Sequence, residues 1–267
     1  MPTTLTDYLT DTASFLHDNN FLFNNPAQLT RWVNQARREI AKQTGCIRRL
    51  LTGQSAFGSS AQPGYFVPGG AQPGSLPNAF PAGTVQGAAA GPFQTIPGQE
   101  RYPFNGFFNP YLQQSHGGCQ RVIDVGGLSV SWGGSVRPTL YWMPWDDLQA
   151  YARAYATLVT SYPYYWSVMN DGGMGEVWLF PVPSFAGDLE ADVYCLPIDL
   201  NSDNDVEAIP EGMREAVKYK AASYAFFAAQ RWSQGLLMDS LFNEHIGVDV
   251  VSLDRGKTPN PYWNALS

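Results

Sequence analysis

The sequence is poor in the residues that most metal sites and disulfide frameworks require. Of its 267 residues, only three are histidine and three are cysteine. The histidines are His17, His116 and His245, and the cysteines are Cys46, Cys119 and Cys195. None of them lie at the short spacings that zinc sites need, and no CxxC pair is present. We therefore expect no metal, no cofactor and three free, buried thiols.

Catalytic and phosphate-binding motifs are also lacking. The sequence contains no GxSxG, no Walker loop and no HExxH. The acidic stretch 199–210 resembles a calcium loop, but Asn204 replaces the required glycine and Pro210 the bidentate glutamate. Helix capping and turn formation explain these acidic residues better. We predict that the protein is not an enzyme.

Long apolar runs and positive charge are scarce. No run of 18 apolar residues predicts a membrane span, and the first residues lack the basic and apolar regions of a signal peptide. The formal net charge is −7, so tight binding to a nucleic-acid backbone is not expected. An acidic wall would still let DNA slide past without sticking.

Two amphipathic helices are predicted at the N-terminus. The first begins at Thr4, with Asp7 at the spacing of a capping box. The second begins at Asn25-Pro26, with Asn as the cap and Pro at the first helical position, and ends at Gly45.

A long alanine-rich helix is predicted over residues 210–231, either ending there or continuing to residue 243. Its small residues leave room for a close helix neighbour. Its second apolar surface is formed by Phe226, Phe227 and Trp232. A helix that is apolar on two sides needs two partners, so we expect one of them to be a neighbouring subunit. A shorter helix is expected over residues 235–241.

The segment 52–99 has a different composition. No charged residue lies between Arg49 and Glu100, and the sequence Ala-Gln-Pro-Gly occurs twice, at 61–64 and 71–74. Proline and glycine interrupt every apolar run, so we interpret the segment as an extended arm laid over another surface, or alternatively as a disordered insertion. Its candidate contact residues are Tyr65, Phe66, Phe80 and Phe93.

The C-terminal tail also combines prolines with aromatic residues. Pro259 and Pro261 forbid regular structure, yet Tyr262 and Trp263 follow directly. These two side chains are candidates to anchor on a partner or to pack back on their own domain.

The region 99–200 has a β pattern. We expect a hairpin over 121–132 that turns at Gly126-Gly127, a strand over 136–143, a helix that opens at Pro144, a second hairpin over 162–180, and a half-buried strand over 189–195.

The predicted fold class is α+β. The N-terminal helix pair and the long C-terminal helix form a helical bundle, into which a β-rich domain of antiparallel hairpins and a long Gly/Pro-rich extended arm are inserted. The expected segments are 1–51 (N-terminal helices), 52–99 (arm), 100–205 (β-rich insert), 206–251 (C-terminal helices completing the bundle) and 252–267 (extended tail).

Several motifs resemble the head-to-tail adaptor (connector) proteins of tailed bacteriophages. They are Glu-Val-Trp-Leu-Phe-Pro-Val-Pro at 176–183, Asp-Val-Tyr at 192–194, Leu-Pro-Ile-Asp-Leu at 196–200, Ile-Pro-Glu at 209–211 and Val-Lys-Tyr-Lys-Ala-Ala at 217–222. Gln-Glu-Arg-Tyr at 99–102 with Val-Ile-Asp-Val at 122–125 also resembles the family. The likeness spans most of 1–50 and 99–245, and the 52–99 insertion and the tail depart from it.

The resemblance implies a non-enzymatic virion protein that is assembled in the host cytoplasm. Its copies would form a ring, commonly of twelve, that binds the portal protein at the capsid vertex and a tail or nozzle protein below. Double-stranded DNA would pass through the channel without sequence-specific binding, and no membrane would be involved. The alternative is a carbohydrate- or receptor-binding β module of a phage tail, in which Trp132, Trp142, Trp145 or Trp166 would stack on sugar rings.

Overall fold

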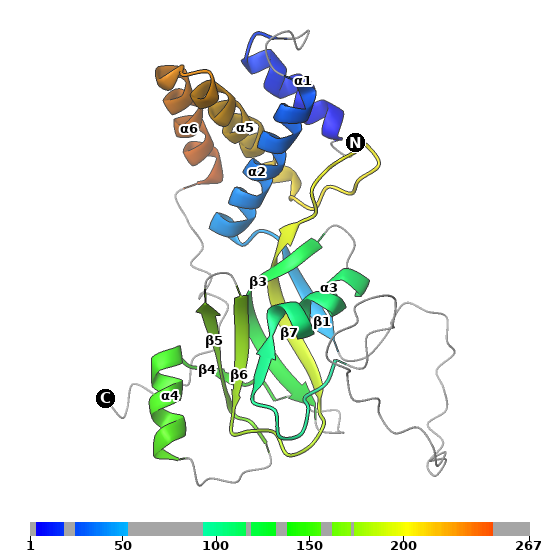
Figure 1. Cartoon of the computed structure of the whole chain (residues 1–267), viewed down its shortest axis with the longest axis vertical. Coiled ribbons are helices and arrows are strands. Elements are labelled where there is room, and N and C mark those ends of the chain that lie inside the picture. The colour runs from blue at the N-terminus through cyan, green and yellow to red at the C-terminus, as the bar shows by residue number, and fades with distance from the viewer. Residues whose placement is uncertain are drawn as a thin grey trace.

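The protein consists of a helical part and a β part that follow one another along the long axis (Figure 1). The computed structural model describes residues 4–18, 25–52, 93–115, 119–131, 138–155, 162–171 and 174–247. The helices in these ranges are α1 (Leu5–Phe15), α2 (Pro26–Thr44), α3 (Asn109–Ser115), α4 (Trp145–Ala154), α5 (Arg214–Ala228) and α6 (Trp232–Ile246). The N- and C-terminal helices pack together, which confirms the mixed α+β class.

Both N-terminal helices begin where the capping signals predicted, and α2 also ends at Gly45 as predicted. The Thr4 side chain accepts a hydrogen bond from the Asp7 backbone N–H, and the Asp7 carboxylate accepts one from the Thr4 N–H. Asn25 caps α2, and Gly45 ends it in the left-handed conformation. These local interactions satisfy the free backbone groups at the helix ends.

The C-terminal segment is a helical hairpin rather than one long helix. A short 3-10 turn (Glu211–Met213) leads into α5, and the chain then reverses direction around Gln230, which has a positive φ of 59°. The alternative of a helix continuing to residue 243 was therefore wrong. Gly235 lies inside α6, where an added Cβ would lie 2.6 Å from the Phe227 ring. Only glycine lets α6 approach α5 so closely.

A buried lysine joins three helices of the bundle. The Lys220 ammonium on α5 lies 3.1 Å from Glu39 on α2 and 2.7 Å from Asp239 on α6. The Tyr224 hydroxyl donates a hydrogen bond to the same Glu39. Burial alone would lower the pKa of Lys220, but the bonds to Asp239 and Glu39 outweigh it and the pKa is raised. The network fixes how α2, α5 and α6 face one another.

The β part contains two sheets. The three-stranded sheet has the order β1 (Arg48–Thr52), β7 (Asp188–Pro197), β3 (Cys119–Ser131). The four-stranded sheet has the order β2 (Arg101–Pro103), β6 (Met174–Phe180), β5 (Tyr165–Asp171), β4 (Tyr141–Trp142). All pairs are antiparallel except β4 with β5, so the β part is not built from hairpins alone.

The strand predictions were partly correct. The hairpin over 162–180 is confirmed as β5 and β6, and the strand over 189–195 lies within β7. The hairpin over 121–132 was wrong, because this stretch belongs to the single strand β3. Gly126 does not form a turn; an added Cβ there would lie 2.9 Å from the Tyr194 ring on β7. The strand β1 follows the predicted end of α2 at Gly45, in a stretch for which no strand was predicted.

Aromatic side chains fill the core of the β part. Phe93 stacks on Phe107, with ring centroids 5.1 Å apart, and meets Phe108 edge-on at 5.6 Å. Phe93 is only 1% exposed, so its assignment as a partner contact on the arm was wrong. The backbone beside it pairs with the β part, because the Thr95 N–H donates to the Gly187 carbonyl.

A buried ion pair joins the helical part to the segment that leaves β7. The Arg37 guanidinium on α2 lies 2.9 Å from Glu207 and also donates to the Ile198 carbonyl at 2.7 Å. Beside it, the Asn34 amide donates to the Leu200 carbonyl and accepts from the Leu200 N–H. The Arg37 and Glu207 side chains are almost fully buried, so removal of either one would leave the other as an unpaired buried charge.

Candidate interaction surfaces

The described part of the chain offers no candidate metal centre or membrane span. Across the ranges that the structure describes, no three His, Cys, Asp or Glu side chains gather closely enough to hold a metal ion. Among the same residues, no helix combines the length and apolar character needed to cross a membrane. The candidate sites are therefore surfaces, and three of them stand out.

The first surface is on α6. Trp232, Leu236 and Leu237 are 64%, 63% and 58% exposed, and we call these three residues the α6 face. Phe227, which is half-buried, lies under Trp232 with ring centroids 5.5 Å apart. Phe226 is buried by its own chain, so its assignment as a contact residue was wrong. The second apolar surface that we predicted for the C-terminal segment thus lies mainly on α6.

The second surface is at the far end of the β part. Tyr162, Tyr164 and Phe185 are each more than two-fifths exposed, and we call them the β-end cluster. The Tyr162 and Phe185 rings lie 6.4 Å apart. A groove of about 320 Å³ opens beside them, and it is lined by Pro138, Thr139, Leu140, Tyr141, Tyr162, Pro163 and Tyr164. The cluster lies where β5 begins and β6 finishes, which is the side of the β part farthest from the helical bundle (Figure 1). The β-end cluster and the α6 face are therefore far apart.

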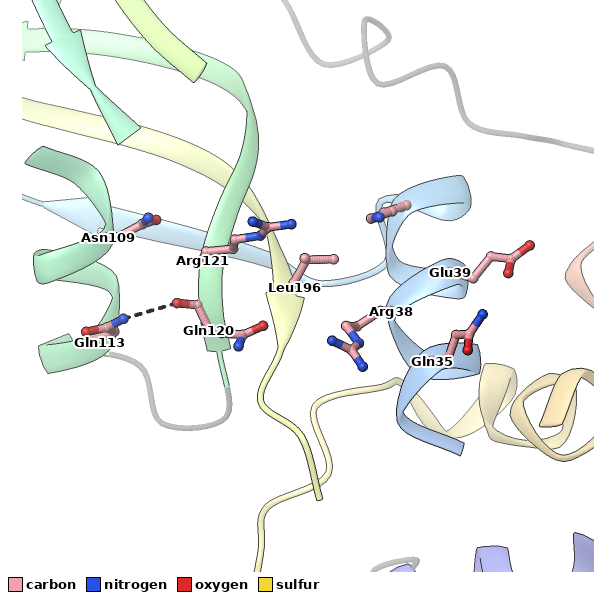
Figure 2. Close-up of a pocket in the computed structure, with 9 residues that line it drawn as sticks. Gln35, Arg38, Glu39, Asn109, Gln113, Gln120, Arg121 and Leu196 are labelled. Carbon is pink, nitrogen blue, oxygen red and sulfur yellow. Dashed lines mark hydrogen bonds between the residues drawn. The ribbon is translucent and has the colours of Figure 1, made fainter. Parts of the chain in front are cut away.

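The third surface is a polar groove of about 650 Å³ at the junction of the two parts. Figure 2 shows Arg38 and Glu39 of α2 on one wall and Arg121 of β3 on the opposite side. The groove is lined by Gln35, Arg38, Glu39, Lys42, Asn109, Gln113, Gln120, Arg121 and Leu196. Its three cations face one carboxylate, Glu39, which is already bound to Lys220. The groove is therefore cationic in a chain whose net charge is −7.

One of the four tryptophans proposed for sugar stacking is a core residue, and Trp142 and Trp145 are half-buried. Trp166 is fully buried, and its indole N–H donates to the Leu140 carbonyl at 3.1 Å. Trp145 packs edge-on against Trp178, with ring centroids 4.5 Å apart. Trp132 lies outside the described residues. Trp166 therefore cannot stack on a sugar without unfolding the sheet around it.

Five other predicted contact residues lie outside the described ranges. They are Tyr65, Phe66 and Phe80 of the arm and Tyr262 and Trp263 of the tail. Leu236 and Leu237 were not among the predicted contact residues, because the second helix was predicted to begin after Trp232. The spacing of four residues between Trp232 and Leu236 was the signal that could have identified this face.

Comparison with known proteins decides the family. A family model described as SU10 adaptor protein matches residues 3–250, which include the described helices and strands of both parts. The chain belongs to the SU10 adaptor family. This family is one of phage head-tail adaptors, so the resemblance found in the sequence is confirmed. No curated protein matches the sequence.

Membership in the SU10 adaptor family implies a structural role in the phage virion. An adaptor binds other virion components and does not catalyse a reaction. This role agrees with a chain whose most prominent described features are exposed surfaces on two separate parts.

Proposed function

We propose that this SU10 adaptor forms a ring, with twelve as the expected number of copies, that joins the portal protein at the capsid vertex to the tail. The lower partner would be a tail or nozzle protein. Double-stranded DNA would pass through the channel of the ring without sequence-specific contacts. Family membership supports the adaptor role, and the surfaces of the chain support the finer proposal.

The observation that carries this proposal is the presence of two separate apolar surfaces on one chain. The α6 face belongs to the helical part, and the β-end cluster belongs to the β part. Large exposed apolar side chains that gather in one place are typical of interaction sites. A ring subunit needs one set of contacts for its neighbours and another for the component above or below, and two distant surfaces meet that need.

The charge of the chain is compatible with DNA passage. The formal net charge of −7 opposes binding to phosphates, which would slow DNA during ejection. Several described cations are also held by carboxylates of the same chain, as in the pairs Arg37–Glu207 and Lys218–Asp11. A ring of such subunits would guide DNA by repulsion rather than by binding.

The proposal is tested by the mass and shape of the purified protein, alone and mixed with its portal protein. We expect a closed ring by native mass spectrometry and by negative-stain electron microscopy, and a joined ring in the presence of the portal. A chain that remains monomeric at all concentrations and with the portal would contradict the proposal.

The β-end cluster provides a second test of the same proposal. The double variant Tyr164→Ala/Phe185→Ala removes two exposed rings without touching the bundle. We expect this variant to form the ring normally but to bind its portal or tail partner more weakly. Binding to both partners at the level of the unchanged chain would remove the β-end cluster from the proposal.

A further inference from the structure

We infer that the α6 face of one copy seats in a groove on the opposite flank of the bundle of a second copy. The receiving groove lies between α2 and the segment after β7, and it is lined by Ala27, Thr30, Arg31, Asn34, Arg38, Asp199 and Asn201. We call it the flank groove. This inference rests on the proposed ring and names the faces that would close it.

The α6 face has the composition of a protein–protein contact. Leu236 follows Trp232 by four positions, so the two side chains lie on the same side of the helix. No charged side chain occurs from Trp232 to Met238. An exposed tryptophan with flanking leucines is typical of the residues that dominate binding energy in interfaces.

The α6 face and the flank groove lie on opposite flanks of the bundle. α6 packs on α5, and Glu39 of α2 contacts α5 through Lys220 and Tyr224. In contrast, Asn34 and Arg38 of α2 point to the segment 198–200 on the other side. Figure 1 shows the same order, with α6 on one side and the segment that follows β7 on the other.

Two different faces on opposite flanks favour a ring over a simple dimer. If α6 of one copy bound α6 of another, both α6 faces would be covered in the dimer and assembly would stop at two copies. If the α6 face of one copy binds the flank groove of the next, every dimer still has one free α6 face and one free flank groove. Further copies therefore add until the ring closes. A second copy of this chain is therefore the occupant that the geometry points to.

The flank groove is chemically suited to the α6 face. It has a volume of about 480 Å³, and its walls carry the guanidinium groups of Arg31 and Arg38. Guanidinium groups bind the faces of tryptophan rings through cation–π contacts. Ile198 and Val206, which are 43% and 69% exposed on the same segment, offer apolar surface for the leucines of the α6 face.

The start of α6 and the acidic segment beside the flank groove carry opposite charge, while the groove itself is lined by Arg31, Arg38 and Asp199. α6 begins at Trp232, with Arg231 as its N-cap, and has no acidic residue in its first turn. The positive end of its dipole is therefore not balanced by a carboxylate of the same turn. The segment beside the flank groove carries Asp199, Asp203 and Asp205. The backbone N–H groups of Asn201 and Ser202 hold the Asp205 carboxylate and lower its pKa, which keeps it ionised.

Mixed cysteine cross-linking tests the pairing directly. Leu236→Cys places a thiol on the α6 face, and Ala27→Cys places one at the exposed edge of the flank groove. Each variant is treated with a short bis-maleimide, alone and after mixing. The unchanged chain, with its native Cys46, Cys119 and Cys195, is the background control.

We expect cross-linked dimers only in the mixture, and a ladder up to the ring size when both cysteines are on one chain. Dimers from Leu236→Cys alone would show that α6 meets α6 and would overturn the inference. Rings that form without any cross-link between positions 27 and 236 would overturn it too, while leaving the proposed ring intact. If no ring forms at all, the proposed function fails as well, so the two failures are distinguishable.

A matched pair of alanine variants gives an independent readout. Trp232→Ala should weaken association between copies by roughly thirtyfold or more, as removal of a dominant contact residue does. Tyr164→Ala removes an aromatic side chain of similar exposure from the β end and should leave association between copies unchanged. Equal association constants for Trp232→Ala and the unchanged chain would contradict the proposed contact.

Discussion

The helical part and the β part both have apolar cores, but they differ in the residues that supplement them. In the helical part, charged groups fix the arrangement: Lys220 joins three helices, and Arg37 binds Glu207 where the chain returns from the sheet. In the β part, rings such as Phe93 and Trp166 form the core. Trp232, Leu236 and Leu237 of α6 are left outside although Phe242 of the same helix is buried, whereas most described large apolar side chains of the β part are inside.

This difference explains where the aromatic residues of the chain are committed. Aromatics make up 14% of the sequence, which at first suggests a broad sticky surface. In the part of the chain that the structure describes, many aromatic side chains stabilise the β part, and the strongly exposed ones are Trp232 of the α6 face, the three rings of the β-end cluster and Tyr155. The aromatic content of the sequence therefore does not identify the residues that could bind a partner. The exposed fraction of each side chain in the structure does.

The strongest test of the contrast is removal of a core ring from the β part. Trp166→Ala should lower the free energy of unfolding by about 3–5 kcal/mol, because a fully buried ring is replaced by a cavity. Chemical denaturation followed by circular dichroism measures this change. A loss below about 1 kcal/mol would mean that Trp166 is not the core residue described above.

A smaller effect is expected at the helix–helix contact of the bundle. Gly235→Ala places a methyl group 2.6 Å from the Phe227 ring and should destabilise the protein by about 1–3 kcal/mol. Gly212→Ala is the matched control, because an added Cβ there meets nothing within 4 Å. Equal thermal midpoints for the two variants would show that α6 does not pack on α5 as described.

Alkaline titration tests the charged network of the bundle. The pKa of Lys220 in the folded protein is raised above its usual 10.5. The stabilisation that the charged Lys220 gives to the fold is therefore complete below pH 10.5 and is lost as the pH rises through the folded-state pKa. Glu39, Asp239 and Tyr224 are the groups that face it.

We expect the unchanged chain to lose more of its free energy of unfolding than Lys220→Met as the pH rises from about 9 through the folded pKa of Lys220. Denaturant unfolding at several pH values measures the difference between the two chains. Parallel stability curves for both chains over this range would contradict the network.

The smallest effect on folding is expected at the α6 face. Trp232 is 64% exposed, so Trp232→Ala should change the free energy of unfolding of the isolated subunit by no more than about 0.5 kcal/mol. Measured at a dilution where copies are separate, a loss as large as that of Trp166→Ala would erase the contrast between the two parts.

Local signals predicted the elements whose ends are fixed by neighbouring residues. Thr4 with Asp7 and Asn25 with Pro26 marked α1 and α2, and the glycines at 172–173 marked the β5–β6 hairpin. These features depend on hydrogen bonds and backbone angles within a few residues, which a sequence displays directly.

Features that depend on distant residues were missed. The pair Gly126-Gly127 was interpreted as a turn. In the structure, the missing side chain of Gly126 leaves room for the Tyr194 ring on another strand. The end of the helix near residue 231 was predicted as one alternative, and α5 ends at Ala228. The positive-φ residue of the reversal, Gln230, is neither glycine nor proline, so no local signal indicated the direction of the turn. Without that reversal, the position of Trp232 on an outer helix could not be derived.

The most direct test of the account is the mass of the assembled species with and without the α6 face. The unchanged chain is compared with the variant Trp232→Ala/Leu236→Ala by native mass spectrometry, each alone and with the portal protein. The account predicts a closed ring for the unchanged chain and a folded, smaller species for the variant. Rings of the same mass from both chains would contradict it.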